Sequence, residues 1–348
     1  MSVSVTWADP AREAACLAWL RRLDPALGLL PDSLRAASAD ASFRRYLRVD
    51  GAAGSLIVMD APPDKENCAP FVQVQALMQQ AGLNVPRILA FDATHGFMLL
   101  SDLGPHTLMQ ALDPQAPQDA FRWYQQATDL LIDWQKASRP GVLPPYDEAL
   151  LRRELALFPD WYLAQHRKVT LTDAQQQTLA QSFAAIVANN LAAPQVFVHR
   201  DFMPRNLMQP VTPDAPLGVL DFQDAVYGPI TYDIASLMRD AFLSWDEDFV
   251  IDITVRYWEK ARKAGIPVRA DFAEFHRDYE WMGVQRHVKV LGIFSRLWHR
   301  DGKDGYLRDM PLVSKYLRAA CARYRHLAPL LRLLDRIEDR PPQAGYTF

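Results

Sequence analysis

Hydrophobic and polar positions follow two different patterns along the chain, and the change falls near residue 104. Before it, short segments with the pattern of strands are separated by turn-like pieces. We predict strands at 34–39, 43–49, 55–60, 87–91 and 97–101, and helices at 9–23 and 71–81. The sequence Asp50-Gly51-Ala52-Ala53-Gly54 predicts a hairpin between the second and third strands. After a short N-terminal helix, the first hundred residues therefore predict the order β-β-β-α-β-β.

After Leu103-Gly104-Pro105 the pattern becomes that of helices. Helices are predicted at 117–136, 148–167 and 172–191, and again from about residue 230 to the end, with a short strand-rich segment at 195–223 between them. The predicted fold class is α+β, with two lobes. Residues 1–103 form a small antiparallel-sheet N-lobe, and residues 104–348 form a large helical C-lobe, with a hinge near 101–106.

The composition narrows the possible functions. The chain has 348 residues, 49% of them hydrophobic and 23% charged, and its formal net charge of −3 is not the basic excess typical of nucleic-acid-binding proteins. Cys16, Cys68 and Cys321 are far apart and lack CxxC spacing, which argues against a zinc site or a disulfide framework. The N-terminal residues lack the pattern of a signal peptide, and no stretch of 18 uncharged apolar residues occurs. We expect a cytoplasmic protein with no nucleic-acid, membrane or obligate protein partner.

The segment 195–223 contains polar residues in a pattern typical of phosphoryl transfer. His199-Arg200-Asp201 follows an apolar strand, and Asn206 follows Asp201 by five residues, which gives H-R-D-x-x-x-x-N. Fifteen residues after Asn206, a second apolar strand ends in Asp221-Phe222. Phosphoryl transfer needs a group that orients the attacking hydroxyl, and oxygen ligands for Mg²⁺ on the phosphates. Asp201 suits the first task, and Asn206 and Asp221 suit the second.

The alternative is a structural loop whose polar side chains bond to the backbone. The second acidic strand end, at hairpin distance from the first motif, favours the site. Within it, His199 is expected to brace the loop rather than to react, because it lies at the end of a strand.

The segments HRDFMPRNLM and LGVLDFQDAVYGPITYDIASL resemble the catalytic and metal-binding loops of aminoglycoside phosphotransferase-like kinases, a branch of the protein-kinase-like superfamily. The order of elements is similar over nearly the whole chain. The resemblance implies a protein-kinase-like bilobal fold, an N-lobe that covers the nucleotide, ATP as the donor, Asp201 as catalytic base, and Asn206 and Asp221 as Mg²⁺ ligands. It also implies a structural role for Asp233, as a helix cap or loop brace. The short segment between Asp221 and Gly228-Pro229 leaves no activation loop for a peptide substrate.

Two parts of the protein-kinase pattern are missing. The turn that should cover the phosphates, 39–46, contains no glycine, and Met59 stands where the third strand should carry a lysine. Arg44 or Arg45 is a candidate for the missing charge, and strand alternation favours only one of them. Ser42 and Arg205 are further candidates for phosphate contact. The alternative is a solvated basic strand.

The helix expected to lie next to the substrate carries basic rather than acidic residues. In the predicted helix around 281–300, one face carries Arg286, Lys289 and Arg296, while the apolar face is expected to pack into the core with Val284, Val288, Leu291 and Trp298. The basic face is either solvated or the wall of an anion-binding pocket. A wall would favour a neutral or acidic substrate over a polycationic aminoglycoside.

The motifs SFRRYLR, LIVMDAPPDKENC and QRHVKVLGIF resemble those of the cell-wall-recycling sugar kinases of this family. That resemblance implies phosphorylation of N-acetylmuramate and N-acetylglucosamine at the anomeric hydroxyl, in peptidoglycan recycling. The alternatives are another small-molecule kinase of the same fold, acting on an aminoglycoside, choline or homoserine, and a nucleotide-binding pseudokinase. The missing lysine favours the pseudokinase, and the intact set of Asp201, Asn206 and Asp221 argues against it.

Overall fold

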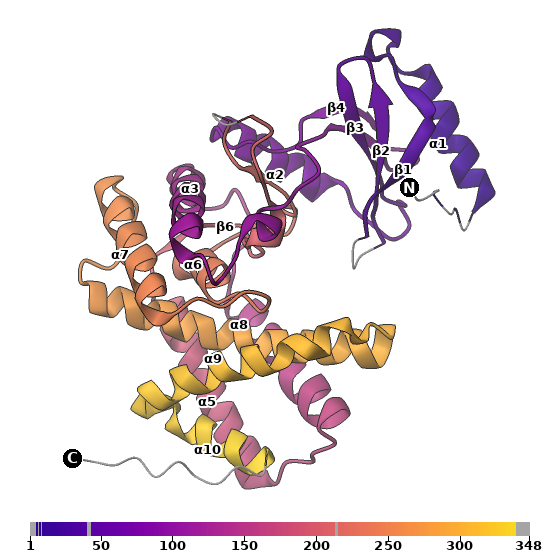
Figure 1. The fold of residues 1–348 in the computed structure, drawn as a ribbon. Coiled ribbons are helices and arrows are strands. Elements are labelled where there is room, and N and C mark those ends of the chain that lie inside the picture. The colour runs from indigo at the N-terminus through magenta and orange to yellow at the C-terminus, as the bar shows by residue number, and fades with distance from the viewer. Residues whose placement is uncertain (1–4, 6, 8, 40–42, 213–214, 339–348) are drawn as a thin grey trace. The chain divides into compact units, whose positions relative to one another are not determined.

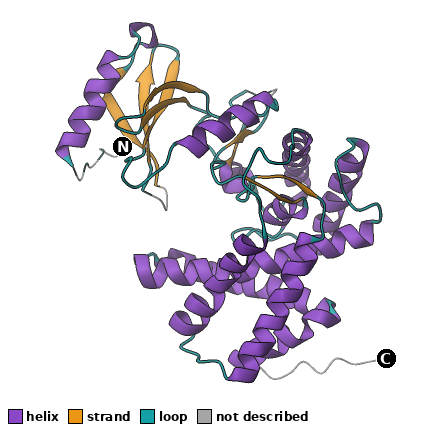
Figure 2. Cartoon of the chain, turned by 180° about the vertical axis from the view of Figure 1, so that it is seen from behind, coloured by secondary structure: helices purple, strands orange, loops and turns teal. Residues whose placement is uncertain are grey.

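The computed structural model describes residues 5, 7, 9–39, 43–212 and 215–338. The chain folds as two units, which we call unit 1 (1–110 with 205–224) and unit 2 (111–204 with 225–348). Figure 2 shows the strands concentrated in the N-terminal part of the chain, while helices make up most of the rest.

A five-stranded antiparallel sheet forms the centre of unit 1, in the order β1-β2-β3-β5-β4. Its strands are β1 (Leu30–Ala39), β2 (Arg45–Gly51), β3 (Gly54–Asp60), β4 (Ile88–Asp92) and β5 (Phe97–Ser101). The five predicted strands are thus confirmed, and β1 begins four residues earlier than predicted. Gly96 in the turn before β5 has a φ of 72°, and a Cβ there would lie 1.9 Å from the carbonyl oxygen of Ala61, so this turn requires glycine.

Two helices complete the N-terminal part of unit 1, α1 (Pro10–Arg22) and α2 (Ala69–Gln80). The side chain of Asp9 caps α1 by accepting a hydrogen bond from the backbone N–H of Ala11. The inner face of α1 packs on one face of the sheet in a core formed by Cys16, Trp19, Leu20, Leu47, Val49, Val58, Phe97 and Leu99. Each fully buried aliphatic or aromatic side chain in such a core contributes roughly 1.5–3 kcal/mol.

The segment 205–224 belongs to unit 1 although it is far from it in sequence. Its two short strands, β7 (Leu207–Met208) and β8 (Gly218–Val219), pair as an antiparallel hairpin. The backbone N–H of Val219 donates to the carbonyl of Asn84 at 2.8 Å, and the Phe222 ring lies 4.9 Å from the ring of Phe71 in α2. These contacts fix the hairpin that carries Asn206 and Asp221.

Unit 2 is built around α8, a buried helix of 30 residues that α9 crosses in Figure 1. Its helices are α3 (Pro117–Lys136), α4 (Glu148–Leu157), α5 (Asp173–Leu191), α6 (Thr231–Met238), α7 (Glu247–Lys263), α8 (Phe272–Asp301), α9 (Met310–Arg323) and α10 (Ala328–Ile337). A Cβ on Gly292 would lie 2.5 Å from the backbone carbonyl of Leu157, so α8 and the end of α4 approach closely only because this residue is glycine. Within the described ranges, no helix has the length and apolarity needed to cross a membrane.

Two features differ from the predicted elements. The helix predicted at 148–167 is α4 followed by a π-helical segment, Phe158–His166, that begins next to Pro159, a residue with no N–H to continue the α-helical ladder. Strand β9 (Val226–Pro229) was not predicted, and it pairs antiparallel with β6 (Gln195–Val198). Glycine and proline are rare in strands, but Gly228 makes room for the side chain of Tyr146, whose Cβ would lie 2.5 Å from a Cβ on residue 228.

Candidate active site

The loop after β6, which we call the catalytic loop (199–206), is held by a buried carboxylate. Asp233, in the first turn of α6, accepts hydrogen bonds from the backbone N–H groups of His199 at 2.7 Å and Arg200 at 2.9 Å. The buried His199 ring accepts a hydrogen bond from the backbone N–H of Asp201 at Nδ1, at 3.2 Å. The structure thus confirms bracing roles for Asp233 and His199, and it leaves Asp201 half-buried on a fixed loop.

The bracing carboxylate lies in an environment that opposes its charge. Burial raises the pKa of Asp233 to about 7, while the two backbone N–H donors and Arg286 favour the ionised form. Because one donor faces each carboxylate oxygen, the observed geometry matches the deprotonated group.

A network of buried charges adjoins the catalytic loop. Glu154 on α4 pairs with the guanidinium of Arg200 at 2.5 Å and with the ammonium of Lys289 at 3.0 Å, and it accepts a short hydrogen bond from the hydroxyl of Tyr146. Burial alone would raise the pKa of Glu154, but Lys289 and Arg200 lower it to about 2, so the carboxylate is ionised. Lys289 also donates to the hydroxyl of Tyr232 at 3.0 Å.

The predicted basic face of α8 is not solvated at its first two positions. Arg286 and Lys289 are 6% and 9% exposed, and Arg286 donates to the carbonyl of Arg200 at 2.9 Å. Arg296, two turns further along, is half-buried near Arg300 and Asp301, and burial together with Arg300 lowers the pKa of its guanidinium. The structure therefore ties Arg286 and Lys289 to the catalytic loop and places Arg296 in a different environment.

The apolar face of α8 agrees with the prediction except at one position. Val284, Val288 and Leu291 are buried, as expected for core residues. Trp298 is 37% exposed, so its assignment to the core was wrong. It lies in the last turn of α8, where fewer neighbouring elements cover the helix.

In unit 1 the hairpin brings the two predicted metal ligands together. The side-chain amide of Asn206 donates to one carboxylate oxygen of Asp221 at 3.2 Å, and the amide of Gln223 donates to the other at 2.8 Å. The backbone N–H of Leu220 donates to the carbonyl of Asn206 at 2.9 Å, which fixes the spacing of the two loops. Asn206 and Asp221 therefore present amide and carboxylate oxygens from adjacent positions, which is a donor set suited to Mg²⁺.

Backbone strain marks both motif loops. Arg200 and Asp221 have φ values of 79° and 64°, and Lys168 is the third non-glycine residue with a positive φ in the described part of the chain. Such conformations cost about 1–3 kcal/mol each and are often found at functional sites.

The candidate phosphate contacts in unit 1 differ in their surroundings. Arg45 is bound to the buried carboxylate of Asp60 and lies over the ring of Trp7 at 4.1 Å. Arg44 lies 3.8 Å from Glu66, a distance too long for a strong hydrogen bond. Both arginines thus lie next to an acidic side chain, and which of them contacts phosphate stays a prediction. Ser42 lies outside the described residues.

Arg205 is exposed in the short 3-10 turn before β7. It directly precedes Asn206 in the hairpin of unit 1, and its predicted contact with phosphate stays a prediction.

Sequence reasoning missed the buried partners of the catalytic loop. Glu154 and Tyr146 stand in stretches that have no motif, and a glutamate in an amphipathic helix usually faces solvent. Leu151 and Leu155, on the same side of α4 as Glu154, are fully buried and give the local indication that this part of the helix faces the core.

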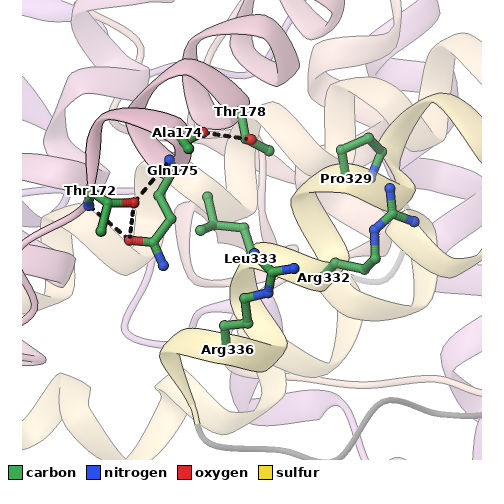
Figure 3. Close-up of a pocket in the computed structure, with 8 residues that line it drawn as sticks. All are labelled: Thr172, Ala174, Gln175, Thr178, Pro329, Arg332, Leu333 and Arg336. Atoms are coloured by element: carbon green, nitrogen blue, oxygen red, sulfur yellow. Dashed lines mark hydrogen bonds between the residues drawn. The ribbon is translucent and has the colours of Figure 1, made fainter.

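A pocket of about 240 Å³ lies between the start of α5 and α10 (Figure 3). On the α5 side, Thr172 and Gln175 bond to one another in a capping box, and Thr178 donates to the carbonyl of Ala174. On the α10 side, Arg332 and Arg336 are exposed. The predicted site residues do not line this pocket.

Comparison with known proteins places this architecture in a family. The model of the phosphotransferase enzyme family matches residues 33–272, and the chain belongs to that family. The fold is the protein-kinase-like fold expected from the motif loops, and an ADP-bound aminoglycoside phosphotransferase with 12% identity superposes with a TM-score of 0.57 over 89% of this chain and 97% of that one. The chain is an enzyme of the phosphotransferase class, as predicted.

Two relatives are much closer in sequence. A protein of Neisseria meningitidis serogroup B is 48% identical over 95% of this chain and 97% of its own length. A protein of Pseudomonas aeruginosa is 52% identical over 87% of this chain and 88% of its own. Both are named N-acetylmuramate/N-acetylglucosamine kinase.

Proposed function

We propose that this protein transfers the terminal phosphoryl group of ATP to the anomeric hydroxyl of N-acetylmuramate and N-acetylglucosamine, giving sugar 1-phosphates and ADP in the cytoplasm. The observation that carries the proposal is the identity of about half of all residues to two kinases of these sugars, over nearly their whole length. Such a reaction serves the recycling of peptidoglycan sugars.

The site supports this reaction with three side chains. Asp201 accepts the proton of the attacking hydroxyl, and an anomeric hydroxyl, more acidic than an ordinary alcohol, makes that task easier. Asn206 and Asp221 are the residues that would hold Mg²⁺, which supplies neutralisation of the phosphate charge when bound. Arg44 replaces the missing third-strand lysine as a phosphate contact.

We also propose roles for the two lobes and for the buried cations of α8. Residues 1–103 cover the nucleotide, and residues 104–348 supply the catalytic loop and the acceptor side. Arg286 and Lys289 serve to position the catalytic loop, because both are buried and bound to its residues or their partners.

Phosphorus NMR of the reaction mixture tests the proposal. We expect ATP, Mg²⁺ and either N-acetyl sugar to give a sugar phosphate whose ³¹P signal couples to the anomeric proton. Asp201→Asn should lower turnover by about 10²–10⁴-fold, because that is the usual contribution of a general base. Turnover of choline, homoserine or an aminoglycoside, with none of the N-acetyl sugars, would reject the proposed acceptor.

A further inference from the structure

A second pocket lies in unit 2 and has a volume of about 260 Å³. The residues that follow α6 form one side, the middle of α8 forms another, and α9 closes the third. Its volume is slightly below the roughly 300–1,000 Å³ of pockets for drug-sized ligands, so it suits a single sugar ring. The sequence motifs did not point to it.

Two buried polar atoms on its wall lack hydrogen-bond partners within the described structure. They are the hydroxyl of Tyr279, a residue with 0% exposure, and Nδ1 of His287, a residue with 4% exposure. Tyr279, Gly283 and His287 are spaced by four residues, so they share one face of α8. A buried polar group left without a partner costs about 1–3 kcal/mol, and these two belong to residues that line one pocket.

The hydrogen bonding of His287 defines what its free nitrogen can bind. Its Nε2 lies 3.3 Å from the carbonyl oxygen of Arg239, and since a carbonyl only accepts, Nε2 carries the proton. Burial lowers the pKa of His287 to about 3, so the ring is neutral and Nδ1 is an acceptor. Burial raises the pKa of Tyr279, which therefore stays a neutral hydroxyl that can donate or accept. A ligand rich in hydroxyl and amide groups satisfies both.

The charged groups around the pocket argue against a metal ion. Glu247, His276 and Glu280 lie close enough to share a cation. However, Glu247 pairs with Arg239 at 2.8 Å, and Arg323 binds both carboxylates. These arginines already neutralise the acids, so the cluster is an ion-pair network rather than a cation site.

Of the charged side chains that line the pocket, Asp246 and Lys315 have no ion pair among the described residues, and Asp246 caps α7 by accepting a hydrogen bond from the backbone N–H of Phe249. Lys315 on α9 is exposed, and the structure gives it no ion pair or hydrogen bond among the residues it describes. It can therefore bind the negative charge of a ligand without losing a partner inside the protein.

The residues of the catalytic loop do not line the pocket, but α6 and α8 each contact the loop and lead to pocket residues. The carbonyl of Arg200 accepts hydrogen bonds from Ser236 on α6 at 3.2 Å and from Arg286 on α8 at 2.9 Å. Arg239, which lines the pocket, follows Ser236 by three residues, and His287 directly follows Arg286. One turn of helix advances about 5.4 Å, so both helices lead from the catalytic loop to the pocket.

We propose that this pocket is the acceptor site, in which Tyr279 and His287 bind the hydroxyl and acetamido groups of an N-acetylhexosamine and Lys315 pairs with the lactyl carboxylate of N-acetylmuramate. The assignment rests on the proposed function and names residues for it that differ from the predicted Arg286, Lys289 and Arg296.

Steady-state kinetics of the full chain with two conservative variants test the pocket. Tyr279→Phe removes only the hydroxyl, and His287→Gln keeps an amide donor for the Arg239 carbonyl while it replaces the ring acceptor Nδ1 with an amide oxygen at a different position. Each should raise KM for N-acetylglucosamine about 5–10-fold, the equivalent of one lost hydrogen bond, and leave KM for ATP unchanged. Tyr279→Phe should not lower the melting temperature, because the hydroxyl has no partner to lose.

Tyr162→Phe is the matched control. Tyr162 is also a buried tyrosine, outside the pocket, and its hydroxyl binds Glu338 at 3.3 Å. This variant should lower the melting temperature slightly and leave both KM values unchanged. If Tyr279→Phe and His287→Gln keep a wild-type KM for a sugar that the wild type phosphorylates, the pocket is not the acceptor site.

Lys315→Ala separates the two sugars. We expect KM for N-acetylmuramate to rise about tenfold while KM for N-acetylglucosamine, which lacks the carboxylate, stays within twofold. Lys263→Ala, a change at an exposed lysine outside the pocket, should alter neither value. Equal effects of Lys315→Ala on both sugars would refute the carboxylate contact. Absence of turnover by the wild type on either sugar would instead overturn the proposed function itself.

Discussion

The buried carboxylate of Glu154 provides a quantitative test of how the catalytic loop is held. Glu154 is 4% exposed, and two cations, Arg200 and Lys289, converge on one of its oxygens. Replacing it with glutamine keeps the shape and removes the charge. The two cations then remain buried without their counterion, which is the costly way to break a buried ion pair.

The magnitude follows from the pKa of the carboxyl group. A fall of the carboxyl pKa from its ordinary value of 4.5 to about 2 corresponds to roughly 3 kcal/mol of stability at neutral pH. Because the folded-state pKa of Glu154 is depressed, this contribution is fully present above pH 4.5 and is lost as the pH falls through 2. We therefore expect Glu154→Gln to lower the free energy of unfolding by about 3 kcal/mol at pH 7, and by progressively less below pH 4.5.

Urea unfolding followed by tryptophan fluorescence, at pH 7 and at pH 3.5, measures both effects. Glu148→Gln is the control, because Glu148 is on the same helix, is 57% exposed and, among the residues that the structure describes, forms its ion pair with Arg152 one turn away. Exposed pairs of this kind are worth about 0.3–0.5 kcal/mol. If the two variants lose the same stability, or if the loss in Glu154→Gln does not shrink in acid, the reasoning about the buried network is wrong.

Three further predictions concern the loops and the helix packing. Arg44→Ala should raise KM for ATP about tenfold. Arg45→Ala should leave KM for ATP unchanged and lower the melting temperature, because Arg45 is bound to Asp60 rather than to phosphate. Equal KM values for the two variants would contradict this assignment. Asp233→Asn should lower kcat at least tenfold with little change in KM for ATP, since an amide NH₂ would face a backbone N–H of the catalytic loop; an unchanged kcat would show that the brace is dispensable. Gly292→Ala should destabilise by about 1–3 kcal/mol, because its Cβ would overlap the backbone of Leu157, and a melting temperature equal to wild type would show that α8 can shift.

Local patterns were enough to predict most of the fold of unit 1. The strands are short apolar or alternating segments, and turns such as His95-Gly96 separate them, so the five strands could be found without tertiary information. Strand β9 could not, because its Gly228-Pro229 sequence argues against a strand and only the neighbouring Tyr146 explains it. The π-helical segment after α4 likewise depends on tertiary packing, since its sequence reads as one continuous helix with α4.

The candidate site could be predicted from the sequence only for residues that belong to a motif. Asp233 and His199 were expected to brace the loop, and the structure shows the hydrogen bonds by which they do so. The basic residues of α8 were expected to be a solvated face or an anion-binding wall. Arg286 and Lys289 are instead buried and bound to partners within the protein. The sequence pattern could not show this, because the partners come from elements far away in sequence. A helical pattern indicates which residues share a face, but not what the face meets.

The charges around the catalytic loop also explain how Asp201, the proposed base, can lie in a largely buried setting. Three cations and three carboxylates gather there: Arg200, Arg286, Lys289, Glu154, Asp201 and Asp233. With equal numbers of each sign, each buried charge has opposite charges nearby, and their attraction offsets part of the cost of desolvation. Of the three carboxylates, Glu154 and Asp233 are buried and bound to loop residues, whereas Asp201 is half-buried. The network therefore fixes the loop with two of its acids and leaves the third accessible to a substrate hydroxyl.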